Sequence, residues 1–164
     1  MISAPIRVLV VDDHTLFRRG LISLLADMDD LQVVGEASDG GEALKLVKKL
    51  NPDIVLLDIN MPVMDGIQTV EALRKMDTPP KIVMFTISQH GDDLISAIRL
   101  GADGYLLKNI EPEDLRKALI RVARGEGALS PEVTGVVLKA LARQTKTTCK
   151  QPISERELEV LNCL

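Results

Sequence analysis

Apolar runs rich in β-branched residues alternate with stretches of helical periodicity along most of the chain, and this alternation limits the fold to one class. The runs span residues 7–11, 33–34, 54–57, 82–85 and 104–107. They are mostly continuous, which is typical of strands covered on both faces. The intervening stretches, in which apolar residues recur every three or four positions, span residues 14–28, 40–50, 66–76, 92–101 and 112–124. Together they predict an α/β fold with a five-stranded parallel sheet sandwiched by five helices.

Length and composition exclude several classes of protein. The 164 residues fit one full domain and part of a second, and the net charge of −4 argues against a nucleic-acid-binding surface over the main body. No apolar run approaches the roughly 20 residues that span a bilayer, so a membrane protein is excluded. The only cysteines, Cys149 and Cys163, lie near the C-terminus and have no metal-ligand spacing. This usage predicts a cytoplasmic location.

The composition changes after residue 125. Residues 126–152 are predicted to form a linker that contains a helix at about 131–142, with Ser130 as its N-cap. A capping box then opens a helix within residues 153–164, which runs into the end of the chain. We interpret this last segment as the start of a truncated second domain.

Polar residues stand at the carboxyl ends of four of the five predicted strands. Asp12 and Asp13 follow the first strand, Asp58 the third, Thr86 the fourth and Lys108 the fifth. Ligands of open parallel sheets bind beyond this edge. Three carboxylates brought together repel one another, and a hard cation such as Mg²⁺ relieves that repulsion with oxygen ligands. The pattern therefore predicts a magnesium site.

A carboxylate beside a metal and a lysine suits covalent phosphoryl chemistry. Asp58 is the predicted nucleophile, because it ends the most hydrophobic strand. The metal and Lys108 would neutralise charge on the transferred oxygens, and the hydroxyl of Thr86 would donate a hydrogen bond to one of them. Each residue alone could simply cap a helix. The presence of all these residues at one edge of the sheet favours a functional site over a set of separate helix caps.

These residues fall within segments that resemble a bacterial response-regulator receiver domain. The matching segments are residues 10–14, residues 56–66, Thr86 and residues 101–108, in the order and spacing of that family. The resemblance covers about residues 5–125 and implies a flavodoxin-like fold. It implies that Asp58 accepts a phosphoryl group from a sensor histidine kinase.

The resemblance also implies a ligand set for Mg²⁺. Asp13, Asp58 and the backbone carbonyl of Asn60 would bind the ion, and Asp12 would contribute through a water molecule.

A switch is implied by the same resemblance. Lys108 would pair with a phosphoryl oxygen, Thr86 would move toward it, and Tyr105 would rotate inward to fill the space. From the residues alone, Tyr105 reads as a half-buried aromatic with a hydrogen-bonded hydroxyl. The chain departs from many receivers in having Asn109, not proline, after Lys108, so we expect a trans peptide bond there.

The C-terminal part resembles the branch of regulators that carry a LuxR-type helix-turn-helix. The resemblance to this branch rests on residues 106–109, 111–115 and 154–161. A similarity to nitrate/nitrite regulators rests on residues 34–38 and 101–107. The resemblance implies DNA binding by a complete C-terminal domain and a homodimer on phosphorylation. Specific DNA binding is not expected of this chain, because residues 153–164 would supply only the first helix. The other reading is an amphipathic helix with no role in DNA binding.

Three functions compete on this evidence from the residues. The first is a transcription regulator controlled by phosphorylation, which is a switch and not an enzyme. The second is a Mg²⁺-dependent phosphatase, but such enzymes want an aspartic acid where Asn60 stands. The third is a receiver that docks a partner protein, which the linker argues against. We expect the first. His14 and His90 are interpreted as loop residues without ligand spacing.

Overall fold

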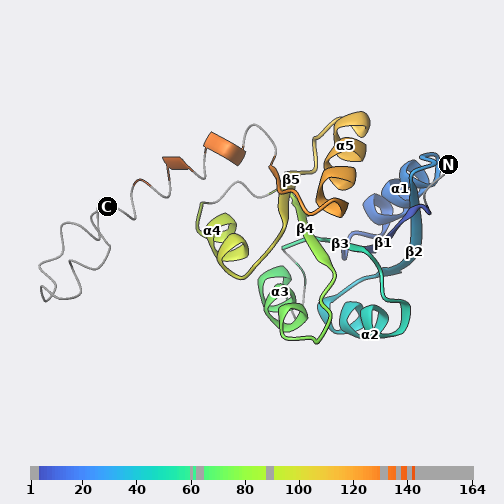
Figure 1. The fold of residues 1–164 in the computed structure, drawn as a ribbon, viewed down its shortest axis with the longest axis horizontal. Coiled ribbons are helices and arrows are strands. Elements are labelled where there is room, and N and C mark those ends of the chain that lie inside the picture. Colours follow the sequence, from blue (N-terminus) through green and yellow to red (C-terminus); the bar gives the residue numbers. More distant parts are fainter. Residues whose placement is uncertain are drawn as a thin grey trace, which may run out of the picture.

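The computed structural model describes residues 4–59, 61, 65–87, 91–129, 133–135, 138–139 and 142. Strands and helices alternate along the chain (Figure 1). Their order is β1 (Ile6–Val11), α1 (Thr15–Ala26), β2 (Leu31–Ala37), α2 (Gly40–Leu50), β3 (Ile54–Leu57), α3 (Gly66–Arg74), β4 (Lys81–Thr86), α4 (Gly91–Arg99), β5 (Gly104–Leu107), α5 (Pro112–Ala123) and β6 (Ala128–Leu129).

The strands of the described residues form one parallel sheet. It has six strands in the order β2-β1-β3-β4-β5-β6. Helices α1 and α5 cover one face, and α2, α3 and α4 cover the other (Figure 1). This arrangement confirms the predicted α/β sandwich.

Each face of the sheet has its own core, because successive strand residues point to opposite faces. Val8 and Val10 of β1 belong to the core beneath α1 and α5. Leu9 and Val11 belong to the core beneath α2, α3 and α4. The interior strand β3 is buried at every position, which explains why its sequence is an unbroken apolar run.

Two strands differ from the prediction. Strand β2 spans Leu31–Ala37, longer than the predicted residues 33–34, and most of it is only half-buried at the sheet edge. Strand β6 was not predicted at all. It pairs with β5 through Gly104 opposite Ala128 and Tyr105 opposite Leu129.

The region after β6 is described only in part. Residues 133–135, 138–139 and 142 are helical, within the range predicted for the linker helix. Val133 is buried and belongs to the core on the α2, α3 and α4 side. The polar stretch 144–152 and the predicted helix in 153–164 lie outside the described residues, as do Cys149 and Cys163. No helix of the described part is long and apolar enough to span a membrane.

Candidate functional site

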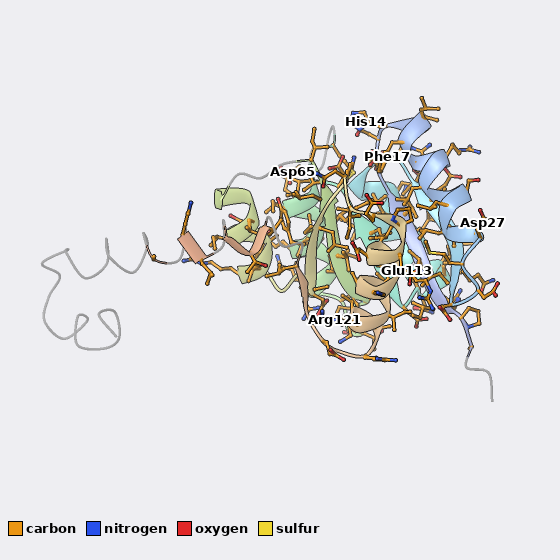
Figure 2. The ribbon with its side chains drawn as sticks, turned by 90° about the horizontal axis from the view of Figure 1, so that it is seen from above. His14, Phe17, Asp27, Asp65, Glu113 and Arg121 are labelled. Carbon is orange, nitrogen blue, oxygen red and sulfur yellow. The ribbon has the colours of Figure 1, made fainter. Side chains whose placement is uncertain are left out.

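The predicted site residues gather at the carboxyl edge of the sheet. Asp12 follows β1, Asp58 follows β3, Thr86 ends β4 and Lys108 follows β5. Neighbouring strands hold these positions in register: the backbone N–H of Asp58 donates to Val11 at 3.1 Å, and that of Lys108 donates to Thr86 at 2.9 Å. In Figure 2 this end of the molecule carries the labels His14, Phe17 and Asp65, and the opposite end carries the label Arg121.

Lys108 bridges two of the carboxylates. Its Nζ lies 2.6 Å from Oδ2 of Asp12 and 3.2 Å from Oδ2 of Asp58. The side chains of Lys108, Asp12 and Asp58 are only 9%, 4% and 3% exposed. Burial away from water strengthens the attraction between these charges and makes an unpaired charge costly. The three side chains therefore hold one another in place.

The carboxylates carry more negative charge than Lys108 offsets. Asp12, Asp13, His14 and Asp58 each present a ligand atom, and these atoms lie within 4.8 Å of one another. Oδ1 of Asp13 is buried and accepts no hydrogen bond within the described part of the chain. A buried carboxylate oxygen that accepts no hydrogen bond, beside other carboxylates, fits a hard divalent cation. Asn60, the fourth predicted ligand, lies outside the described residues.

His14 is a member of the cluster that the sequence reasoning missed. It lies in the loop before α1, as predicted, but its Nδ1 is 3.1 Å from Oδ1 of Asp12 and 3.1 Å from Oδ1 of Asp13. The same nitrogen is 4.0 Å from Oδ2 of Asp58. One feature of the sequence could have predicted its place in the cluster: His14 directly follows two aspartates at the end of a strand. His90 lies outside the described residues.

Arg18 supports the cluster from α1. Its Nη1 donates to the backbone oxygen of Asp12 at 2.6 Å, and its Nε donates to Oε1 of Glu36 on β2 at 2.7 Å. The Arg18 side chain is 10% exposed. A buried guanidinium thus joins the end of β1 to its neighbouring strand and fixes the backbone of Asp12.

Gly66 brings the first turn of α3 against the backbone of Asp58. Its N–H donates to the oxygen of Ile59 at 2.7 Å. A Cβ at this position would collide with the backbone oxygen of Asp58 and lie 2.6 Å from Cα of Ile59. The helix itself begins with a capping box, in which Asp65 and Gln68 exchange hydrogen bonds. Only glycine allows this close approach.

Thr86 and Tyr105 lie on neighbouring strands, and both side chains are fully buried. Tyr105 pairs with Met84, and Thr86 pairs with Leu107. The half-buried placement that the amphipathic character of Tyr105 favoured is therefore not adopted. The peptide bonds of the described residues are all trans, including the one before Asn109.

Outside the cluster, one cation is held by a strong local pair. Arg116 on α5 donates from Nε to Oδ2 of Asp30 at 2.7 Å. This hydrogen bond and the charge of Asp30, with a smaller contribution from Glu113, raise the pKa of Arg116 above its ordinary value.

Comparisons with known proteins match most of the chain. Residues 8–120 match the response regulator receiver domain. The nitrate/nitrite response regulator protein NarL of Escherichia coli K12 is 41% identical over 162 residues, which cover 98% of this chain and 75% of NarL.

Two solved structures are also similar. The crystal structure of a LuxR-family two-component response regulator from Aurantimonas sp. SI85-9A1 has a TM-score of 0.79 and 32% identity, covering 84% of this chain and 99% of that chain. RcsB of Salmonella enterica serovar Typhimurium, solved bound to the promoter P1flhDC with the phosphomimetic BeF₃⁻, has a TM-score of 0.77 and 25% identity. That match covers 85% of this chain and 70% of RcsB.

Proposed function

The chain belongs to the response regulator receiver domain family of two-component systems, and from this membership we propose that it is a switch set by phosphorylation of Asp58. The observation that carries the proposal is the bridge from Lys108 to Asp12 and Asp58, beside the buried oxygen of Asp13 that accepts no hydrogen bond. Regulatory switching, not turnover of a substrate, is the role of this family. We propose the same regulatory role for this chain. The only reactions that it would catalyse are its own phosphotransfer and autodephosphorylation.

Asp58 is the phosphoacceptor. One carboxylate oxygen attacks the phosphorus of the donor, the new O–P bond forms as the bond to the leaving group breaks, and the leaving group takes that electron pair. Asp12 is less suited to attack, because its Oδ1 accepts the backbone N–H of His14 at 2.8 Å and its Oδ2 accepts Lys108 at 2.6 Å. The physiological donor in this proposal is a sensor histidine kinase.

The cofactor is Mg²⁺. Asp13, Asp58 and the backbone carbonyl of Asn60 would hold it, with Asp12 contributing through a water molecule. When bound, the ion supplies positive charge that stabilises the transferred phosphoryl oxygens. The excess of carboxylates over cations in the cluster supports this assignment.

Lys108 and Thr86 stabilise the phosphorylated state. Lys108 exchanges its contact with Asp58 for a phosphoryl oxygen, and Thr86 moves to donate its hydroxyl to another. Tyr105 then follows into the space that Thr86 leaves. These motions shift an equilibrium between two conformations of the face formed by α4, β4 and β5.

The output is control of transcription. We propose a receiver at residues 5–125, a linker at 126–152 and the start of a LuxR-type helix-turn-helix at 153–164. The complete C-terminal domain binds DNA as a dimer after phosphorylation, in the cytoplasm, whereas the first helix alone does not bind specifically. The sequence identity with NarL and the promoter-bound structure of RcsB support this output.

Intact mass after incubation with Mg²⁺ and a small phosphodonor tests the proposal. We expect the parent to gain one phosphoryl group and the Asp58→Asn variant to gain none. Chelation of Mg²⁺ with EDTA should abolish the gain. The proposal is overturned if the parent gains nothing while binding Mg²⁺, or if the Asp58→Asn variant gains as much as the parent.

A further inference from the structure

The ammonium group of Lys108 has a third neighbour besides the two aspartates. Its Nζ lies 4.5 Å from the centroid of the Phe17 ring, over the ring face. A lysine within about 6 Å of an aromatic face is attracted by the negative charge of that face, and the attraction grows when the cation is shielded from water. The Lys108 side chain is 9% exposed, so this attraction acts with little screening.

The Phe17 ring is itself held in place. Phe17 lies on α1, and its ring packs against that of Phe85 on β4, with centroids 5.9 Å apart and planes tilted by 47°. Phe85 is 4% exposed and directly precedes Thr86. Tilted aromatic pairs are favourable at this separation. The contact with Phe85 therefore restrains the Phe17 ring.

An ammonium group has three N–H donors, and Asp12 and Asp58 accept two of them. The face of Phe17 contacts the remaining part of the cation but accepts no strong directional hydrogen bond. Its attraction persists while Lys108 changes partners. A carboxylate or a water molecule in the same place would compete for the donor instead.

We propose that Phe17 is a positioning residue for phosphoryl transfer, which holds the Lys108 ammonium beside Asp58 through its ring face. The inference rests on the proposed function and goes beyond it. Loss of the aromatic face leaves Lys108 free to adopt other rotamers, so the phosphoryl oxygens meet a correctly placed cation less often.

The test is a series of Phe17 variants. Phe17→Leu removes the ring but keeps an apolar side chain, Phe17→Trp retains an aromatic face, and a fluorinated phenylalanine keeps the shape while weakening the charge of the face. The matched control is Leu24→Ala, on the same face of α1, which lines one pocket together with Phe17 and Lys108. Each variant is treated with Mg²⁺ and phosphoramidate, and the rate of mass gain is measured.

We expect Phe17→Leu to slow phosphorylation about tenfold, as for the loss of a shielded cation–π contact. Phe17→Trp should keep the parent rate, the fluorinated variant should be intermediate, and Leu24→Ala should be unchanged. NMR supplies a second readout, because a ring face shifts the Lys108 Cε protons upfield. The upfield shift should vanish in Phe17→Leu and persist in Phe17→Trp. If Phe17 had only a structural role, the rate of phosphorylation would not follow this shift across the variants.

Equal rates for all variants, or a Lys108 signal that does not depend on the ring, would overturn this inference and leave the proposed function intact. A rate that falls equally in Phe17→Leu and Leu24→Ala would also overturn it. Failure of the parent itself to gain a phosphoryl group overturns the proposed function, and the role of Phe17 with it.

Discussion

At the scale of single residues, Arg18 is the buried cation that joins α1 to the end of β1. Replacement by methionine keeps the volume but leaves Glu36 and the backbone oxygen of Asp12 without their buried partner. We expect Arg18→Met to lower the free energy of unfolding by about 2 kcal/mol, because the buried backbone oxygen of Asp12 loses its donor and Glu36 keeps only the exposed Arg19. Urea denaturation measures the loss.

Arg19 is the natural control for this prediction. Its Nε lies 3.3 Å from the same oxygen of Glu36, but the Arg19 side chain is 67% exposed. An ion pair in water contributes about 0.5 kcal/mol or less. Arg19→Met should therefore have little effect, and equal losses in the two variants would show that Arg18 is no more than a surface charge.

His14 leads to a prediction about metal preference. Imidazole nitrogen favours Ni²⁺ over Mg²⁺, whereas carboxylates favour Mg²⁺. If Nδ1 of His14 joins the aspartates in binding a cation, His14→Ala should weaken Ni²⁺ about tenfold and Mg²⁺ by much less. Isothermal titration calorimetry with each ion provides the measurement, and Leu16→Ala, which changes an exposed side chain in the first turn of α1, is the control. Equal changes in the affinities for Ni²⁺ and Mg²⁺ would exclude His14 as a ligand.

The sequence predicted which aspartates, threonine and lysine come together, because parallel strands bring their carboxyl ends to one edge. It did not predict the residues that orient them. Arg18 lies on α1 and Glu36 lies 18 residues later on β2, and neither residue belongs to a distinctive motif. Phe17 resembles any apolar residue of an amphipathic helix until its distance to Lys108 is known.

At the scale of elements, the start of α3 is the tightest junction with the site. We expect Gly66→Ala to lower the free energy of unfolding by about 3 kcal/mol, because the added methyl meets backbone atoms that cannot rotate away. Gly20→Ala on α1 is the matched control, since nothing lies within 4 Å of its Cβ position. That variant should stabilise the protein by about 1 kcal/mol through helix propensity.

Thermal unfolding of the two variants measures both effects. A tolerated Gly66→Ala would mean that α3 can shift away from Asp58 at little cost, and the close approach would then have no structural importance.

The strands that the sequence predicted well are those buried on both faces. Strand β3 reads as a strand because every position is apolar. Strand β2 was found only at its two valines, because Gln32, Gly35 and Glu36 interrupt the apolar pattern of an edge strand. Strand β6 consists of two residues after a glycine-rich turn, which is too short for any periodicity.

At the scale of the whole molecule, β6 covers the edge of β5. The N–H of Ala128 donates to the oxygen of Asp103 at 3.3 Å. Ala128→Pro removes this donor, so we expect the amides along β5 to exchange with solvent at least several-fold faster. Hydrogen exchange followed by NMR measures the change. Gly127→Ala, whose Cβ has room at 3.6 Å from Asp103, should exchange like the parent.

Unchanged exchange in Ala128→Pro would show that the edge of β5 is protected without β6. The prediction concerns the receiver alone and does not depend on phosphorylation.

Val133 belongs to the same core as Tyr105, on the side of the sheet opposite Phe17 and Phe85. A coupling free energy between two places in a protein is reciprocal. If a change at Tyr105 alters how firmly Val133 is seated, then whatever pulls Val133 out of the core alters the phosphorylated state by the same factor. Under the proposed function, a molecule that engages the segment after β6 would then act on Asp58 from the far side of the sheet, and the output end of the proposed switch would also serve as an input.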